Sequence, residues 1–341
     1  MYLNDNMQKN AGLCVWAVAH SEDVKKADCF VLTHNDEIYL VDGGIHGSYH
    51  AIKFLLDMRR RLAQKDLSVI LNEDFKLRIN LVISHFHNDH VEALLESVVP
   101  SPYLEIDNVY VPDICGVPER FELIGKNGDR YYREKLRELL GKYHKNHKWH
   151  VIPFGSENVL RFSKNTGTKQ EVKFTFYPLP FDPGREDYLE FMIESYKKDG
   201  VRMDFHAYTY ALNAASLWFK AEFAGRSFLF TGDTMKRSTE LDNEALDFMM
   251  KAYREDIGDI DVLKYVHHGF ARDAAAEDML SFNSKYIILS TQLATAKEAM
   301  LAIEPDTRSE ILNCGLDTYK FAVNDDGELK MRLIPKVIAT E

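Results

Sequence analysis

Four side chains that can bind a metal ion stand close together in the sequence, at His85, His87, Asp89 and His90. They follow directly on the apolar run Leu81–Ile83, which predicts a short buried strand. Alternate side chains of a strand point the same way, so His85 and His87 are expected to face one point. The turn that follows can bring Asp89 and His90 toward that point. Imidazole and carboxylate suit zinc, iron or manganese, and a polar loop with scattered histidines would rarely be so dense.

Two further groups of this chemistry lie far along the chain. Asp233 follows a strongly apolar strand behind Gly232, where a buried carboxylate is costly unless it is paired or binds a metal. The alternative is that Asp233 caps a helix that begins after Thr234. His267 and His268 end another buried strand and can supply two ligands, or one ligand and one substrate contact. A single histidine satisfied within the core is the plainer alternative.

Asp42 stands at the end of a β-rich run, directly before two glycines. We interpret it mainly as a carboxylate that orients a ligand histidine, with a plain turn residue as the alternative.

The predicted elements around these residues occur twice in the same order. The first half holds a hairpin of Cys29–Leu32 and Ile38–Val41, Asp42, a helix over Tyr49–Ala63, the strand Leu81–Ile83 with its histidines, and a helix over Val91–Val98. The second half holds a hairpin of Leu217–Phe223 and Phe228–Phe230, Asp233, a helix over Glu240–Tyr253, and the strand Val262–Val266 with its histidines. The repetition predicts two βα halves that face each other across one site.

Residues 1–341 are expected to form a single domain, with a helical insertion at about 112–210. Within the insertion, Glu119–Lys148 carries nine Lys or Arg and five acidic residues. This segment is either a solvated helix or a rim that handles an anionic substrate, with Arg130, Arg133, Lys135 and Arg137 as its cations. After the second half, a strand is expected over Tyr286–Ser290, a helix over Thr295–Ile303 and a hairpin around Asn324–Gly327.

Composition excludes several classes of protein. The 341 residues are 45% hydrophobic and 28% charged, which is typical of a globular chain. A formal net charge of -11 argues against a bulk nucleic-acid coat. No apolar run approaches the length of a membrane-spanning helix. Four widely spaced cysteines argue against a disulfide framework and favour a reduced, cytoplasmic location. Ala11–Ala19 is interpreted as a buried first strand, with a secretory signal as the alternative.

These residues resemble the motifs of the metallo-β-lactamase superfamily. The matching positions are Asp42 with its glycines, the motif from His85 to His90, Thr231–Asp233, and His267 with His268. Within that superfamily the chain is most similar to the hydrolase domain of ComEC-type DNA-uptake proteins and their free-standing relatives, through Asn213–Leu217, Thr231–Asp233 and Asp261–Lys264. The likeness covers about 29–99 and 211–290. It implies an α/β fold, the αββα four-layer sandwich of two facing βα halves.

The resemblance also implies a metal site, with two zinc ions expected and manganese or iron as alternatives. The implied ligands are His85 and His87 on one ion, Asp89, His90 and His267 on the other, and Asp233 as a bridge. His268 is the alternative to His267, and the member of the pair that is not a ligand would stabilise charge on the substrate. Asp89 would also take a proton from the nucleophile, so Asp89 and His268 are the expected catalytic residues.

The implied function is hydrolysis by a metal-bound hydroxide, with a phosphodiester or a nucleic-acid-like molecule as the anionic substrate. One alternative is a catalytically weak metal-binding or regulatory protein of the same fold. A second is an iron-type redox protein, although the chain offers no room for a flavin domain.

Departures from the family pattern concern one metal position and the first strand. Most members have a histidine before the second hairpin, where this chain has Leu212 and Asn213. Either Asn213 fills the position or His206 reaches in from the insertion. The Gln-Gly-Asp of the ComEC-like first strand is replaced by Lys26-Ala27-Asp28, which weakens the case for a DNA substrate.

Overall fold

The structure is a computed structural model of the chain, and it describes eleven segments. They are residues 12–20, 26–35, 37–46, 50–64, 74–113, 129–180, 212–234, 245–269, 275–303, 308–315 and 317–334.

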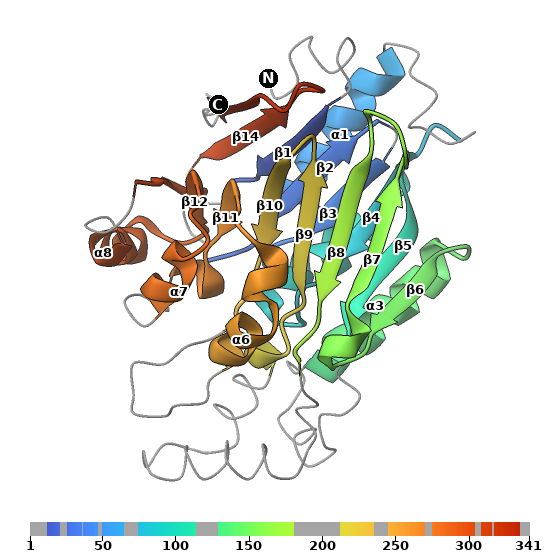
Figure 1. The fold of residues 1–341 in the computed structure, drawn as a ribbon. Coiled ribbons are helices and arrows are strands. Elements are labelled where there is room, and N and C mark those ends of the chain that lie inside the picture. The colour runs from blue at the N-terminus through green and yellow to red at the C-terminus, as the bar shows by residue number, and fades with distance from the viewer. Residues whose placement is uncertain are drawn as a thin grey trace.

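Two large sheets form the centre of the molecule (Figure 1). The first sheet has the strand order β15-β14-β1-β2-β3-β4-β5-β6, and the second has the order β13-β12-β11-β10-β9-β8-β7. The strands of the first sheet are β1 (Leu13–Ala17), β2 (Phe30–His34), β3 (Glu37–Val41), β4 (Leu77–Val82), β5 (Leu104–Pro112), β6 (Lys148–Ile152), β14 (Thr318–Val323) and β15 (Leu329–Ile334). Those of the second are β7 (Leu160–Lys164), β8 (Val172–Tyr177), β9 (Trp218–Phe223), β10 (Arg226–Phe230), β11 (Val262–Lys264), β12 (Tyr286–Leu289) and β13 (Glu310–Asn313).

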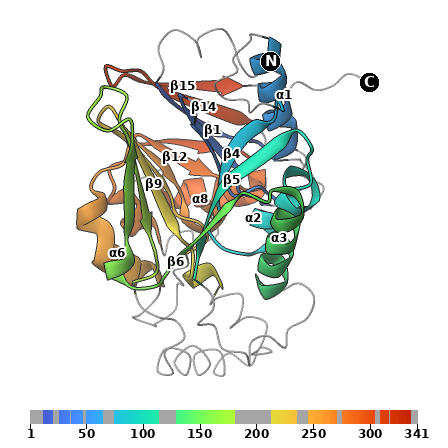
Figure 2. The ribbon, with the colours of Figure 1, turned by 90° about the vertical axis from the view of Figure 1, so that its right-hand side faces the viewer.

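Helices form the two outer layers, with α1, α2 and α3 on one side and α6 on the other in Figure 2. The helices are α1 (His50–Gln64), α2 (Asn88–Ala93), α3 (Asp129–Tyr143), α6 (Ala245–Ile257), α7 (Ala276–Leu280) and α8 (Leu293–Ile303). Short turns of π or 3-10 helix are η1 (Leu94–Val98), η4 (Ser156–Asn158) and η5 (Val266–Gly269).

Three apolar clusters correspond to the three interfaces between these four layers. The middle cluster joins the two sheets, and it includes Phe30 from the first and Phe230 from the second, whose ring centroids are 5.0 Å apart. The other two clusters hold the helices against the outer faces of the sheets. Successive side chains of a strand point to opposite faces of the sheet, and both faces of each sheet are buried. This explains why most strands are almost wholly apolar. The predicted αββα sandwich is confirmed.

The two halves share one strand pattern. Strands β1 to β3 and β8 to β10 are antiparallel neighbours, whereas β3 to β6 and β10 to β13 are parallel neighbours. A βα crossover joins β3 to β4 through α1, and another joins β10 to β11 through α6. The predicted repetition is confirmed, and it places the ends of β3, β4, β10 and β11 at one site.

The expectation of a helical insertion at 112–210 needs correction. Its described part holds α3, but also β6, β7 and β8, which extend the two sheets. Helix α3 is amphipathic: Tyr132, Leu136 and Leu140 are buried in the cluster under the first sheet, and Tyr131 is exposed. The β-rich run around Val151 lacked the dense hydrophobicity of the other strands, because β6 is a partly exposed edge strand.

Three smaller expectations concern the chain as a whole. Leu13–Ala17 forms the buried strand β1 between β14 and β2, as the strand interpretation predicts. Cys14, Cys29 and Cys314 form no disulfide, and Cys115 lies outside the described residues. Within the described segments, no helix is long and apolar enough to cross a membrane.

Candidate metal centre

The site lies where four strands end, two from each half. Asp42 follows β3, and the motif that begins at His85 follows β4. Asp233 follows β10, and His267 and His268 follow β11. Carboxyl ends of parallel strands meet at one edge of a sheet, and the two sheets place these edges face to face. The fold thus gathers residues that lie up to 226 positions apart, from Asp42 to His268.

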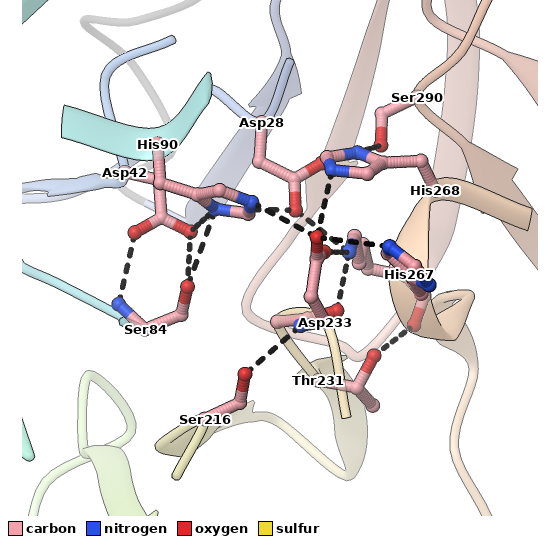
Figure 3. Close-up of polar contacts among 12 residues, drawn as sticks. Asp28, Asp42, Ser84, His90, Ser216, Thr231, Asp233, His267, His268 and Ser290 are labelled. Atoms are coloured by element: carbon pink, nitrogen blue, oxygen red, sulfur yellow. Dashed lines mark hydrogen bonds and ion pairs between the residues drawn. The ribbon is translucent and has the colours of Figure 1, made fainter. Parts of the chain in front are cut away.

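Three buried atoms converge at the centre of the site (Figure 3). The carboxylate oxygen Oδ2 of Asp233 lies 3.4 Å from Nε2 of His90 and 3.1 Å from Nε2 of His268. All three side chains are 0% exposed. Among the described residues, none of these three atoms has a hydrogen-bond partner. Buried polar atoms are rarely left so, and two imidazole nitrogens with one carboxylate oxygen form a donor set that suits a divalent ion.

A carboxylate holds the far nitrogen of His90. Oδ2 of Asp42 lies 2.9 Å from Nδ1 of His90. Ser84 fixes that carboxylate through its backbone N–H at 2.9 Å and its hydroxyl at 2.7 Å. A carboxylate that accepts the Nδ1 proton leaves the Nε2 lone pair directed at the centre. Asp42 therefore lies where an orienting carboxylate is expected, and its φ of 55° shows that it also makes a turn.

A second carboxylate, Asp28, holds the far nitrogen of His268 in the same manner. Nδ1 of His268 lies 3.1 Å from Oδ1 of Asp28 and 2.9 Å from the hydroxyl of Ser290. The Ser290 hydroxyl donates in turn to Asp28. Lys264, which is 1% exposed, places its ammonium 2.7 Å from Oδ2 of Asp28 and 3.3 Å from Oδ1 of Asp233.

Sequence reasoning missed Asp28 and Lys264 as parts of the site. It treated Lys26-Ala27-Asp28 only as a departure from a family pattern. The missed signal was a buried charge on each side of the core: a lysine inside the apolar run around Val262 and an aspartate directly before the apolar run at Phe30. Charged residues are seldom buried unless they are paired, so Asp28 and Lys264 could have been recognised as partners.

The two histidines of the pair lie at different distances from the centre. His268 belongs to the group of Asp28, His90 and Asp233 whose ligand atoms lie within 4.8 Å of one another. His267 is 16% exposed, and its Nε2 is 3.8 Å from Oδ2 of Asp233. Of the two candidates, the geometry therefore favours His268 as a ligand. His267 has a φ of 46° and His268 a φ of 56°, so the pair forms a left-handed turn. This turn decides which ring points inward, and histidine is not a residue type from which such a turn would be predicted.

A second group with metal-binding geometry consists of His85, His87 and Asp233. Nε2 of His85 lies 3.0 Å from Nδ1 of His87. Asp233 is common to both groups. Asn213 is buried on the short turn before β9, and its carbonyl accepts from the backbone N–H of Ser216 at 3.1 Å. His206, the other candidate for the absent histidine, lies outside the described residues.

Asp89 belongs to neither group, although its carboxylate reaches the first one. Its Oδ2 lies 2.9 Å from the ammonium of Lys26 and 3.3 Å from Nε2 of His268. Helix α2 begins at Asn88 and includes Asp89 and His90, so the helix begins inside the motif and not after it. The side chain expected to bind an ion is paired with a lysine.

Gly232 permits the close packing of the two halves beneath Asp233. Its φ is 56°, and a Cβ placed there would lie 2.8 Å from the hydroxyl oxygen of Ser216 and 3.0 Å from Cβ of Ser84. The Ser216 hydroxyl accepts from the backbone N–H of Asp233 at 3.0 Å. Any larger residue would therefore displace the Asp233 turn.

The charges at the centre stabilise one another. Burial alone would lower the pKa of His268, but the carboxylates of Asp233 and Asp28 outweigh it and raise the pKa to about 9. Burial would raise the pKa of Asp233, but His268, His90 and Lys264 hold that pKa well below its usual range. Since a metal ligand must release its proton, an ion would replace protons on the imidazoles of this group.

The outer histidines behave differently. Burial lowers the pKa of His87 to about 4 and that of His267 to about 3. Both rings are therefore neutral at neutral pH and can offer a lone pair to an ion or one N–H to a substrate.

Comparisons with known proteins bear on the fold. No family model matches the sequence, and no curated protein matches it. The metallo-beta-lactamase fold protein YhfI from Bacillus subtilis is 11% identical over 94% of this chain and 100% of its own, with a TM-score of 0.41. The short form of human tRNase Z is 12% identical over 88% and 93%, with a TM-score of 0.34. A diphosphatase from the PhnP family is 10% identical over 95% and 99%, with a TM-score of 0.40. These likenesses concern the course of the chain and not its chemistry.

Proposed function

We propose that this protein is a metal-dependent hydrolase that acts on phosphodiesters. The observation that carries the proposal is the convergence of His90, His268 and Asp233 from two halves of the fold on one buried point. The far side of each imidazole is held by its own carboxylate, Asp42 or Asp28. Such carboxylate–histidine pairs are typical of metal centres.

The residues around the centre divide the remaining work. When bound, a divalent ion supplies a water of lowered pKa and a positive charge for a developing oxyanion. Asp89 stays ionised beside Lys26 and can accept a proton from the nucleophile. His267 is neutral and partly exposed, so its N–H can donate to a substrate oxygen.

An anionic substrate fits the local charge better than the overall charge of -11. Arg133 and Arg137 lie on α3, and the hydroxyl of Tyr132 on this helix donates to Glu92 of α2 at 2.6 Å. Helix α2 also carries Asp89 and His90, so the contact with Glu92 holds α3 about one helical turn from the centre. The α3 cations can attract a phosphate group, and guanidinium matches its geometry. The side chain of Arg130 is not among those that the structure describes.

Turnover of bis(p-nitrophenyl) phosphate tests the proposal. The protein is stripped with a chelator and reloaded with zinc or manganese, and hydrolysis is followed at each stage. We expect turnover only after reloading, with little or no turnover of a chromogenic β-lactam. Asp233→Asn should reduce turnover about 100-fold or more, because it removes the shared carboxylate. Asp326→Asn, in an exposed hairpin turn, is the matched control.

The regulatory alternative has one observation in its favour, the amide at Asn213 where most relatives of the fold have an imidazole. It predicts a bound ion without turnover of any ester. The iron-type redox alternative predicts a coloured protein that loses its colour on reduction.

A further inference from the structure

Lys26 is the feature of this site that the proposed hydrolase does not require. Its ammonium lies 2.9 Å from Oδ2 of Asp89, and its side chain is 31% exposed. The backbone holds it in place: Lys26 forms a β-bridge with Thr291, and Asp28 donates from its N–H to the Asp89 carbonyl at 3.3 Å. Lys26 and Asp28 are two positions apart in an extended segment, so both side chains point into the centre.

We infer that Lys26 acts as a built-in counter-ion that limits the centre to one tightly bound divalent ion per chain. The inference rests on the proposed metal centre and concerns how many ions it holds. Its first ground is that Asp89, expected as a ligand, already has a cationic partner. A buried carboxylate requires one counter-charge, from a metal or from a side chain. The ammonium supplies it.

The second ground is the charge of the whole centre. Four carboxylates are buried there, those of Asp28, Asp42, Asp89 and Asp233. Two ammonium groups face them, Lys264 and Lys26. With neutral imidazoles, two negative charges remain, and one divalent ion balances them. A second divalent ion would leave an excess of positive charge in a buried site, which is costly.

The third ground is the weakness of the second ligand group. It consists of His85, His87 and Asp233, and its single carboxylate is shared with the first group. The Lys26 charge acts on His87 electrostatically, as does that of Asp89. Lys26 therefore repels a cation at this group. It also neutralises the negative charge of Asp89, which would otherwise attract one. Lys26 also acts electrostatically on Asp233 and Asp28 of the first group, but that group has two carboxylates where the second has one.

The test is zinc stoichiometry, measured by elemental analysis after dialysis against a weak chelator. The native protein should retain one equivalent per chain. Lys26→Met should retain two, with the second bound about tenfold or more tightly than in the native protein. Lys26→Arg keeps the charge and should retain one. Lys320→Met removes a lysine that lies over the ring of Trp16, away from the centre, and should also retain one.

A double variant guards against nonspecific zinc. Lys26→Met combined with Asp89→Asn should return to one equivalent, since the second ion depends on the released carboxylate. Two equivalents in the native protein, or one in a folded Lys26→Met, would overturn the inference while leaving the hydrolase proposal intact. Absence of tight zinc from every variant would refute the hydrolase proposal, and the inference with it.

Discussion

His90 and His268 come from opposite halves of the fold, yet their ring centroids lie 5.1 Å apart. His90 lies in helix α2 after β4, and His268 lies in the left-handed turn after β11. Each directs Nε2 at the same oxygen of Asp233, and each gives Nδ1 to its own carboxylate. The centre is thus built from two equivalent imidazole–carboxylate pairs around one shared acid.

Asp28→Asn should weaken zinc binding about 10–100-fold, the range typical of carboxylates that orient a ligand histidine. An amide is nearly the same size as the carboxylate, but it supplies no charge for Lys264 and a weaker acceptor for His268. Zinc affinity is measured by competition with a chromogenic chelator. Asp42→Asn should behave alike, and an unchanged affinity in Asp28→Asn would contradict the role assigned to it.

The histidine pair should separate into a ligand and a substrate contact. His268→Ala is expected to lose tight zinc, because its ring points at the shared carboxylate. His267→Ala should keep the zinc and lower kcat for bis(p-nitrophenyl) phosphate, because its partly exposed ring faces the substrate side. Elemental analysis and steady-state kinetics on both variants check this. Zinc lost from His267→Ala and kept by His268→Ala would restore the order first expected from the sequence.

Zinc affinity should rise with pH up to about pH 9. In the metal-free protein the pKa of His268 is raised from 6.5 to about 9, so an ion must displace its proton below that pH. The sign reverses for the stability of the metal-free fold. A raised pKa stabilises the folded state fully below pH 6.5, and this contribution is lost as the pH rises through about 9. Chelator competition and thermal melting across pH 6–10 measure both trends, and a flat affinity profile would argue against displacement of a proton.

Asn213→His should keep or raise affinity at the group of His85 and His87. The substitution places an imidazole where the family that the sequence resembles is expected to have one, and three imidazoles form a common zinc set. Chelator titration of the variant in the Lys26→Met background isolates this group, since the second ion is expected there. Weaker retention would show that Asn213 does not face the site and would favour His206.

The sequence predicted most of the strands and helices and about half of the residues at the metal centre. Apolar periodicity located the hairpins and crossovers, and the density of the motif at His85 to His90 located the site. Two features were beyond its reach. The inward ring of the pair follows from positive φ at His267 and His268, which depends on tertiary packing. Asp28 is joined to His268 across 240 residues of chain, a distance at which single-sequence patterns carry no signal. Its charge next to an apolar strand was visible, but it was interpreted as a loss.

The most direct measurement is anomalous diffraction at the zinc edge from crystals of the zinc-loaded protein. We expect one strong peak per chain, coordinated by His90 Nε2, His268 Nε2 and Asp233 Oδ2, with the Lys26 ammonium still beside Asp89. The absence of a peak between these three atoms, in crystals that hold zinc elsewhere, would contradict it.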